Sequence, residues 1–340
     1  MIQAIMNRPG ELTFREVPVP AVAPHQIKVK MKRIGVCGSD VHVFHGRHPY
    51  TSYPVVQGHE VSATVVEVGA EVRKLVPGDK VTIQPQVVCG RCHPCTHGMY
   101  NACEELKVMG FQTTGMASEY FVTEADKALR LPDTMSYEQG AMIEPLAVAV
   151  HAVRRCGDVT DRNVVVLGGG PIGNLVAQTA KAMGAADVLL SELSAYRLET
   201  ASRCGIKVVN PSRESLPGKI VATFGPDKAD AIFECVGIDA TLKQAIDCAR
   251  KGSDIVVVGV FADLATINVG FVQDHELRLI GTAMYRVEDY LEAIELAAAG
   301  LVGLDALITH TVRFPDYLKA YRIIDEQKDK AMKVMVTFED

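Results

Sequence analysis

The sequence predicts an α/β protein of two domains, one mainly antiparallel β and one built on a doubly wound parallel sheet. Its 340 residues exceed the usual size of a single domain. Up to about residue 130, short alternating runs such as QIKVKMKRIGV are separated by Pro and Gly turns, which is typical of antiparallel strands. After Pro132, strand and helix patterns alternate, which indicates βαβ units and a parallel sheet.

The second region begins with a helical pattern over residues 137–157. The predicted strands that follow are NVVVL, DVLLSE, KVVN, ADAIFECVG, DIVVVGVF and LRLIGTAM, with helices over GNLVAQTAKAMG, AYRLETASRCG and TLKQAIDCARKG. From about Arg286 we expect a helix, EDYLEAIELAAAG, and a closing strand, KVMVTFED, that returns to the first domain. No repeat or low-complexity linker separates the domains, so we expect them to pack with a cleft between them.

Composition excludes several classes of protein. A net charge of -6 and the lack of a long basic run argue against nucleic-acid binding, including by a zinc ribbon. The N-terminus lacks a signal-peptide pattern, and the longest apolar runs are only strand-sized, so we expect a cytoplasmic protein without membrane spans. Of the nine cysteines, four lie in apolar segments and are expected to be small buried hydrophobes in a reducing compartment: Cys156, Cys204, Cys235 and Cys248.

Four other cysteines lie close together in the sequence, at Cys89, Cys92, Cys95 and Cys103. Glycine and proline between them allow the backbone to turn tightly, and four thiolates fill a tetrahedral zinc shell. The pattern therefore predicts a structural zinc site, with two disulfides as the alternative. His93 and His97 lie inside this stretch and are expected to be loop residues, because no coordination position is left for them.

A glycine-rich turn follows the predicted strand NVVVL and opens a helix. In this context Gly168, Gly170 and Gly173 match the dinucleotide-binding fingerprint, with Pro171 and Ile172 in the same turn. The first glycine permits the turn, the second lets a pyrophosphate approach the backbone, and the third lets the helix pack closely on the sheet.

The end of the next predicted strand selects the cofactor. Glu192 lies 19 residues beyond Gly173, where a carboxylate can accept hydrogen bonds from both ribose hydroxyls and repel a 2′-phosphate. NAD is therefore favoured over NADP, although Arg197 nearby could approach a 2′-phosphate. Val236 and Val258 complete the residues that we expect at the cofactor.

A second candidate metal site combines Cys37 with His59 and Glu60, 22 and 23 residues further along the chain. Three protein ligands leave one coordination position of zinc open, as catalysis requires. Each residue alone would be unremarkable, but their presence beside a dinucleotide-binding pattern points to a metal-dependent oxidoreductase.

Several stretches together resemble one family, the zinc-dependent medium-chain dehydrogenases, and within it most closely the sorbitol (polyol) dehydrogenases. They are GVCGSDVH, GHE followed by Gly69 and Val72, PGDKV, the four-cysteine stretch, IEPLAVAVHAVRR, LGGGPIG and DVLLSELSAYRL. The resemblance spans essentially the whole chain. It implies a GroES-like catalytic domain over 1–147 and 286–340, interrupted by a Rossmann domain over 148–285.

The resemblance also implies roles for individual residues. Cys37, His59 and Glu60 would bind a catalytic zinc, with Glu144 beside the metal, and either carboxylate could hold the ion. Ser39 would take the proton of the alcohol and His42 would pass it outward. Asp40 would orient the zinc-bound imidazole.

The predicted reaction is zinc-dependent oxidation of a secondary alcohol of a polyol, sugar or sugar acid, with hydride transfer to NAD. Tyr50, Phe111, Glu144 and Tyr285 are expected around the substrate, but Met284 stands where polyol dehydrogenases show an arginine. L-Threonine 3-dehydrogenase and a non-catalytic nucleotide-sensing protein remain alternatives. The resemblance further implies a homodimer or homotetramer that pairs Rossmann sheet edges near DIVVVGVF and HELRLIGTA.

Overall fold

A computed structural model describes residues 1–338 of the chain as two compact units. Unit 1 comprises Met1–Glu144, Arg286–Ile294 and the residues from Ile308 onward, and unit 2 comprises Pro145–Tyr285 and Glu295–Leu307. The stretch 295–307, which the sequence analysis places with the catalytic domain, is thus grouped with unit 2.

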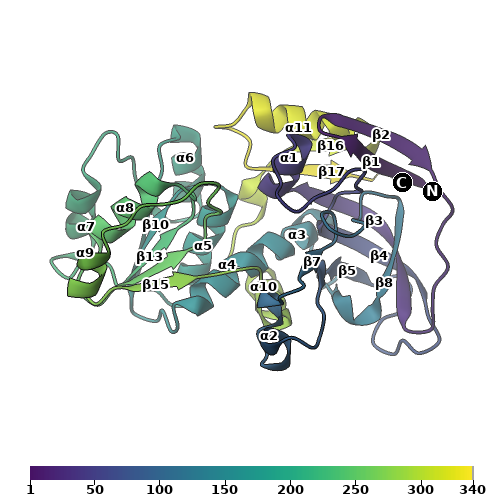
Figure 1. Cartoon of the computed structure of the whole chain (residues 1–340), viewed down its shortest axis with the longest axis horizontal. Coiled ribbons are helices and arrows are strands. Elements are labelled where there is room, and N and C mark those ends of the chain that lie inside the picture. Colours follow the sequence, from purple (N-terminus) through teal and green to yellow (C-terminus); the bar gives the residue numbers. More distant parts are fainter. Residues whose placement is uncertain (339–340) are drawn as a thin grey trace. The chain divides into compact units, whose positions relative to one another are not determined.

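Unit 1 is built on a seven-stranded sheet in the order β16-β17-β3-β4-β5-β9, with β8 pairing to β3 (Figure 1). All its pairs are antiparallel except the parallel pair β16–β17. The closing strand pairs with β3, as expected, while its predicted last residues, Glu339 and Asp340, lie outside the described residues. The strands are β3 (Gln26–Val36), β4 (Glu60–Val68), β5 (Lys80–Ile83), β8 (Tyr120–Glu124), β9 (Ala128–Arg130), β16 (Ile308–Arg313) and β17 (Lys333–Thr337).

Short elements surround this sheet. Two further antiparallel pairs are β1 (Ile2–Arg8) with β2 (Glu11–Glu16), and β6 (Gln86–Val87) with β7 (Lys107–Val108). The helices that lie within unit 1 are α1 (Gly38–Phe44), α2 (His93–Thr96), α3 (Tyr137–Ala141) and α11 (Tyr317–Glu326), and α10 (Val287–Ala298) begins there. Single 3-10 turns occupy Tyr100–Ala102, Ala125–Lys127 and Phe314–Asp316 in unit 1, and Asp305–Leu307 in unit 2.

Unit 2 contains the predicted parallel sheet, with six strands in the order β12-β11-β10-β13-β14-β15. The strands are β10 (Asn163–Leu167), β11 (Asp187–Ser191), β12 (Lys207–Val209), β13 (Ala231–Glu234), β14 (Asp254–Val257) and β15 (Arg278–Gly281). The helices are α4 (Ile143–Arg155), α5 (Pro171–Ala182), α6 (Ala195–Arg203), α7 (Leu216–Phe224), α8 (Asp239–Cys248) and α9 (Val269–Asp274). The chain adds β11 and β12 on one side of β10 and then β13, β14 and β15 on the other side. In doubly wound sheets, ligands bind at the carboxyl ends of the strands where the order changes direction, here at β10, β11 and β13.

The expected single helix over 137–157 is wrong. The structure has two helices, α3 and α4, separated at Met142. Pro145 explains the break because it has no N–H to donate to the carbonyl of Ala141, whereas it is tolerated in the first turn of a new helix.

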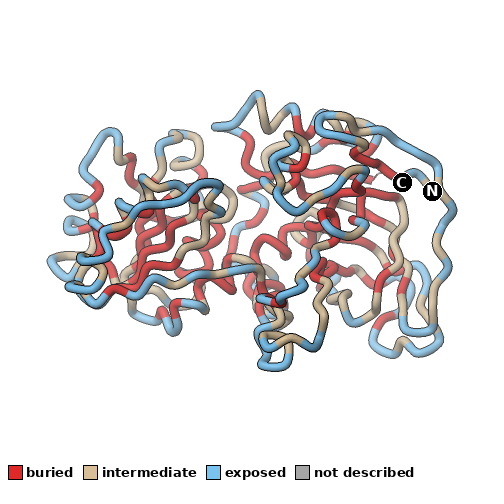
Figure 2. The backbone as a smooth tube through the Cα atoms, in the orientation of Figure 1, coloured by how far each residue is buried: buried red, intermediate tan, exposed pale blue. Residues whose placement is uncertain are grey.

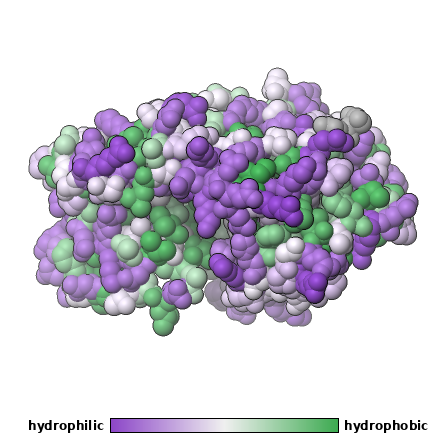
Figure 3. Space-filling view, turned by 90° about the horizontal axis from the view of Figure 1, so that it is seen from above, coloured by the Kyte–Doolittle hydropathy of each residue, from purple (hydrophilic) through white to green (hydrophobic). Residues whose placement is uncertain are grey.

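Buried residues concentrate in the strands of both sheets (Figure 2). In β3 the core residues Ile27, Val29 and Met31 alternate with more exposed ones, whereas Val164–Leu167 of β10 are buried without interruption, as expected for a strand covered on both faces. On the face shown in Figure 3, hydrophilic side chains cover much of the surface, with hydrophobic ones scattered between them. Within residues 1–338, none of the helices has the length and apolarity needed to cross a membrane.

Candidate active site

The structure brings Cys37, His59 and Glu60 together in unit 1. Cys37 follows β3 and Glu60 opens β4, and these strands are paired, with Gly35 opposite Glu60. One possible ligand atom from each of the three residues lies within 4.8 Å of those of the other two. His59 and Glu60 are buried, at 4% and 1% exposure, so the cluster is shielded from bulk water.

Asp40 lies behind the imidazole of His59. Its Oδ1 is 3.6 Å from Nδ1 of His59, and Asp40 itself is fully buried. The Nδ1 atom has no hydrogen-bond partner among the described residues, so a small movement would pair it with Asp40. Burial alone would lower the pKa of His59, but the neighbouring Asp40 and Cys37 outweigh it and raise that pKa well above its usual value.

Asp40 is itself held from several sides. Its Oδ2 accepts a hydrogen bond of 2.9 Å from the backbone N–H of Cys37, and its Oδ1 accepts one of 3.1 Å from Nε2 of Gln57. The hydroxyl of Tyr321 then donates to Oε1 of Gln57 over 2.8 Å. Gln57 and Tyr321 were not predicted from the sequence; Gln57 lies only two residues before His59, but Tyr321 comes from α11 and only folding brings it here.

Glu60 has a buried cationic partner that sequence reasoning also missed. Nζ of Lys333 lies 2.6 Å from Oε1 and 2.5 Å from Oε2 of Glu60. Burial alone would lower the pKa of Lys333, but Glu60, Cys37 and Glu144 outweigh it and raise that pKa. The lysine is therefore a charged ammonium facing the candidate ligands.

Glu144 lies in the first turn of α4 and is 5% exposed. It does not belong to the group formed by Cys37, His59 and Glu60, but its charge acts on Lys333 and so places it in the same neighbourhood. Among the described residues, the group of possible metal ligands at this site therefore contains Glu60 and not Glu144.

These donors fit zinc. A thiolate, an imidazole and a carboxylate are the ligand types that Zn²⁺ takes, and three of them leave the open position of a catalytic site. Nδ1 of His59 faces a carboxylate, the usual arrangement behind a zinc-bound imidazole. Ser39 and His42 lie three residues apart on α1, so their side chains share one face of the helix, and His42 is exposed to solvent.

The four-cysteine stretch forms a second cluster, also in unit 1. Its four thiols lie within 4.8 Å of one another. Sγ atoms are 4.0 Å apart for Cys89 and Cys95 and 3.8 Å apart for Cys92 and Cys103. Four thiolates around one zinc would be separated by about 3.8 Å, given Zn–S bonds of about 2.3 Å. All nine cysteines of the chain are free thiols, so the disulfide alternative is not what the structure shows.

The pKa values of two of these thiols are shifted in opposite directions. Backbone N–H groups of Arg91 and Cys92 lower the pKa of Cys89 to about 6, whereas desolvation and the neighbouring thiols raise the pKa of Cys95 to about 12. Four thiols this close cannot all ionise without a cation between them. His93 and His97 stack on each other at 3.9 Å between ring centroids and stand outside the thiol group.

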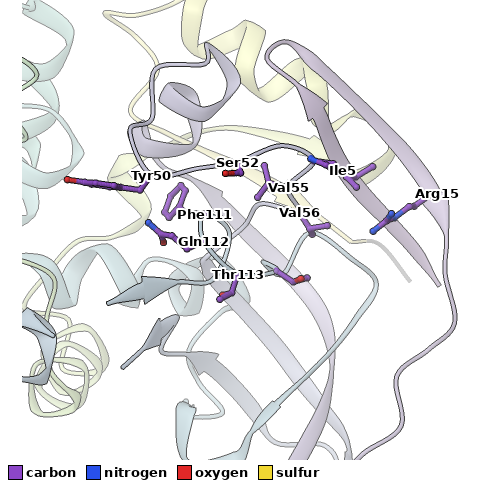
Figure 4. Close-up of a pocket in the computed structure, with 11 residues that line it drawn as sticks. Ile5, Arg15, Tyr50, Ser52, Val55, Val56, Phe111, Gln112 and Thr113 are labelled. Carbon is purple, nitrogen blue, oxygen red and sulfur yellow. The ribbon is translucent and has the colours of Figure 1, made fainter. Parts of the chain in front are cut away.

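A cavity of about 520 Å³ in unit 1 is lined by two of the predicted substrate residues (Figure 4). Tyr50, which is 74% exposed, lies at one end of this cavity and Arg15 at the other. Phe111 is buried, and its ring lies 4.9 Å from that of His59 and stacks on His48 at 4.6 Å. Phe111 thus forms a wall between the cavity and the imidazole.

The third predicted substrate residue, Tyr285, belongs to unit 2 and is fully buried. Met284 before it has a φ of 52°, a left-handed conformation that is uncommon for a side chain of this size. Arg286 is assigned to unit 1, and its backbone N–H donates to Oδ2 of Asp289 at the start of α10. Arg286 therefore lies just before α10 and is assigned to a different unit from Tyr285.

The glycine-rich turn lies at the end of β10, as predicted. Gly168 has a φ of 98°, which only glycine adopts easily, and a Cβ on Gly173 would lie 1.9 Å from the carbonyl oxygen of Gly168. The helix α5 begins at Pro171, with Ile172 in its first turn. A pocket of about 460 Å³ opens beside this turn, with Gly168, Gly170 and Glu192 in its lining. The arrangement fits a pyrophosphate at the N-terminus of α5.

Glu192 organises the adjacent loop. Its Oε2 accepts from the backbone N–H of Gly169 over 2.8 Å, and its Oε1 accepts from those of Leu193 and Ser194. Nη1 of Arg197 lies 3.7 Å from Oε2 of Glu192. A carboxylate and a guanidinium therefore face the pocket side by side where the adenosine ribose is expected.

The loop after β13 lines the pocket with Cys235 and Val236. A residue that was not predicted, Glu234, anchors this loop. This fully buried carboxylate accepts through Oε1 from the backbone N–H groups of Val236 and Gly237 and from the hydroxyl of Thr241. Val236 lines the pocket, as predicted. Val258 does not, but its N–H donates to the backbone carbonyl of Glu234 and so joins the loop after β14 to the same anchor.

Comparisons with known families agree with this geometry. Residues 23–133 match the alcohol dehydrogenase GroES-like domain, and residues 171–299 match the zinc-binding dehydrogenase domain. Sorbitol dehydrogenase of Ovis aries is 33% identical over 342 residues, which cover 98% of this chain and 96% of the relative. The 2-dehydro-3-deoxy-L-galactonate 5-dehydrogenase of Pseudoalteromonas atlantica is 34% identical over 330 residues, which cover 96% of each chain.

Solved structures with bound cofactor share the fold along the whole chain. A zinc-binding dehydrogenase from Sinorhizobium meliloti bound to NADP has a TM-score of 0.89 and 30% identity, and covers 99% of both chains. An alcohol dehydrogenase from Escherichia coli in complex with NADH has a TM-score of 0.91 and 28% identity, again over 99% of both chains. The predicted fold and enzyme class are thereby confirmed, and the chain belongs to the zinc-dependent medium-chain dehydrogenases, close to the sorbitol dehydrogenases.

Proposed function

We propose that this dehydrogenase oxidises a secondary alcohol of a polyol, sugar or sugar acid to a ketone, with NAD as hydride acceptor. The observation that carries the proposal is the meeting of Cys37 with the buried His59 and Glu60 in one cluster, in a chain of this family. The relatives named for sorbitol and for a deoxygalactonate act on polyhydroxylated chains, which supports this substrate class.

Cys37, His59 and Glu60 hold the catalytic zinc. When bound, zinc supplies Lewis-acid polarisation of the substrate oxygen and NAD supplies the hydride acceptor. The chain provides the fixed surroundings for that chemistry. Asp40 keeps Nδ1 of His59 protonated and oriented, and its own position is fixed by Cys37 and Gln57.

Ser39 and His42 carry the proton of the alcohol outward. Ser39 is partly buried beside the candidate ligand Cys37, and His42 one helical turn later is exposed to solvent. A hydroxyl next to the metal and an imidazole at the surface of the same helix face give a proton a short route to water.

A second zinc, held by the four thiols, has a structural role, because four protein ligands leave no position for a substrate. NAD is preferred over NADP, since the Glu192 carboxylate would repel a 2′-phosphate and partly neutralises Arg197. The free state of all nine cysteines supports a reducing, cytoplasmic location.

Substrate contacts come from Tyr50 and Phe111 in unit 1 and from Tyr285 in unit 2, with Glu144 near the metal. The enzyme acts as a homodimer or homotetramer that pairs the β15 edges of its sheets. β15 is the last strand of that sheet, and Leu279 on it is 39% exposed. The loop between β14 and α9 exposes Val260 and Leu264 at 86% and 100%. An apolar, unpaired strand edge favours pairing with a second copy.

The test is the initial rate of NADH formation with a panel of sugar alcohols, aldoses, sugar acids, polyol phosphates and L-threonine. We expect one polyol, sugar or sugar acid to react well, with NAD giving a higher kcat/KM than NADP. Exclusive oxidation of L-threonine, or binding of NAD without turnover of any compound, would contradict the proposal.

A further inference from the structure

The closest partner of the candidate ligand Glu60 is a buried lysine from the other end of the chain. Nζ of Lys333 contacts both carboxylate oxygens, at 2.6 and 2.5 Å, and Lys333 is only 3% exposed. A buried lysine that is paired in this way costs free energy to desolvate, and replacing such a pair with apolar residues is often neutral or stabilising. Stability alone therefore does not explain why a lysine stands beside this carboxylate.

The sheet is shaped to let the two side chains meet. Lys333 opens β17 and Glu60 opens β4, and both strands pair with β3 between them. Gly35 of β3 lies opposite Glu60, and a Cβ at Gly35 would come within 2.2 Å of Oε2 of Glu60. A side chain on the central strand would therefore force the carboxylate away from the ammonium, and glycine leaves the passage open.

The charge of Lys333 affects how the Glu60 carboxylate can bind the metal. As zinc ligands, the Cys37 thiolate and the Glu60 carboxylate would carry two negative charges, which Zn²⁺ alone balances. The ammonium of Lys333, in contact with both oxygens of Glu60, adds a positive charge that the metal site itself does not need. The ammonium is also a competitor, because any carboxylate oxygen that zinc takes must be shared with Nζ of Lys333 or withdrawn from it.

We propose that Lys333 is a positioning residue of the metal centre, whose ammonium competes with zinc for the Glu60 carboxylate and keeps the bond between Glu60 and zinc weak and exchangeable. The proposal rests on the catalytic zinc proposed above. Such a bond would let Glu60 leave the metal without becoming a buried carboxylate that has no cationic partner.

The test is the metal affinity of Lys333→Met, measured by chelator competition, and the absorption spectrum of cobalt(II) placed in the same site. In the metal-free variant Glu60 is buried without a cation, so zinc should bind at least about tenfold more tightly than in the wild type. The cobalt bands should shift, because Glu60 becomes a permanent ligand. Neither measurement requires turnover.

Three further variants make the result specific. Lys333→Arg retains a cation and should keep wild-type affinity and spectrum. Lys28→Met is the matched control, because Lys28 of β3 makes a 2.6 Å ion pair with the half-exposed Glu67 of β4, outside the candidate metal cluster. Adding Lys333→Met to Glu60→Gln should have no further effect on zinc affinity, because the carboxylate for which the two cations compete is gone.

Unchanged or weaker zinc binding in Lys333→Met, an unshifted cobalt spectrum, or a Lys333→Arg variant that behaves like Lys333→Met would overturn the proposal. If Lys333→Met does not fold without metal, Lys333→Gln takes its place in both measurements, because glutamine keeps a polar side chain but removes the cation. Failure of the proposed catalytic zinc would look different, because cobalt would then not bind at Cys37 in the wild type either.

Discussion

Oδ1 of Asp40 lies 3.6 Å from Nδ1 of His59, and both residues are buried. The same carboxyl group accepts hydrogen bonds from the backbone of Cys37 and from Gln57, so it joins two candidate zinc ligands to the helix α11 through Tyr321. Asp40 thus has a fixed position beside the imidazole, from which a small movement of His59 would pair its Nδ1 with the carboxylate.

Replacing Asp40 by asparagine should weaken catalytic zinc binding or activity by about 10- to 100-fold, because the imidazole loses its anionic partner. Zinc content after dialysis and kcat/KM measure this effect. Asp133→Asn, which changes an exposed carboxylate of the same unit, should match the wild type. Equal zinc retention in Asp40→Asn and Asp133→Asn would show that Asp40 does not support the ligand.

Replacing Glu192 by alanine should lower the preference for NAD over NADP. Lost hydrogen bonds from ribose to a charged acceptor correspond to about 1.5 to 3 kcal/mol, or roughly a 10- to 100-fold change in affinity for NAD. The ratio of kcat/KM for the two cofactors measures the change. Glu199→Ala, on the exposed face of α6, is the control, and a preference that survives in Glu192→Ala would assign cofactor selection to other residues.

Replacing Cys103 by serine should remove one of the two zinc ions and lower the melting temperature by about 5 °C or more, because the metal stabilises the folded loop. Metal analysis should then give one zinc per chain, and cobalt should still enter the Cys37 site. Cys204→Ser, outside both clusters, should retain two. Two zinc ions in Cys103→Ser would refute the four-thiol site.

The acid stability of unit 2 should depend on Asp254. Burial alone would raise the pKa of Asp254, but hydrogen bonds from Arg278 and Arg162 outweigh it and lower that pKa below its usual value. The pKa of Asp254 is thus lower in the folded protein than in the unfolded chain. The ionised carboxylate therefore stabilises the fold fully at pH values above the ordinary pKa of aspartate. This contribution is lost as the pH falls through the pKa of the folded protein.

Asp254→Asn should therefore lower the free energy of unfolding by about 3 kcal/mol at neutral pH and by less near pH 3, below the ordinary pKa of aspartate. Denaturant unfolding at both pH values measures the difference. Asp247→Asn, at an exposed position in the same unit, should change little at either pH. A loss of equal size at both pH values would mean that the ion pairs are not its source.

The parts that were predictable from the sequence are those encoded within one short segment. The four cysteines lie within 15 residues, and the glycine turn is flanked by its own strand and helix, so neither needs knowledge of distant contacts. The uninterrupted apolar run of β10 likewise predicts a strand covered on both faces.

The missed features depend on partners that are distant in sequence. Lys333 meets Glu60 across 273 residues, and Tyr321 meets Gln57 across 264, so sheet register and helix docking decide both contacts. Nothing in the segment KVMVTFED distinguishes its lysine from a surface residue. The break between α3 and α4 was missed because the helical periodicity of residues 137–157 outweighed the signal of Pro145.

The most direct test of the central claim is the rate of NADH formation on the best substrate of the panel, measured before removal of the catalytic metal, after its removal, and after addition of one equivalent of zinc. The account predicts that removal of the metal abolishes the rate while NAD still binds. Added zinc should restore the rate of the wild type but not that of Cys37→Ser. A rate that is unaffected by removal of the metal from the Cys37 site would contradict the account.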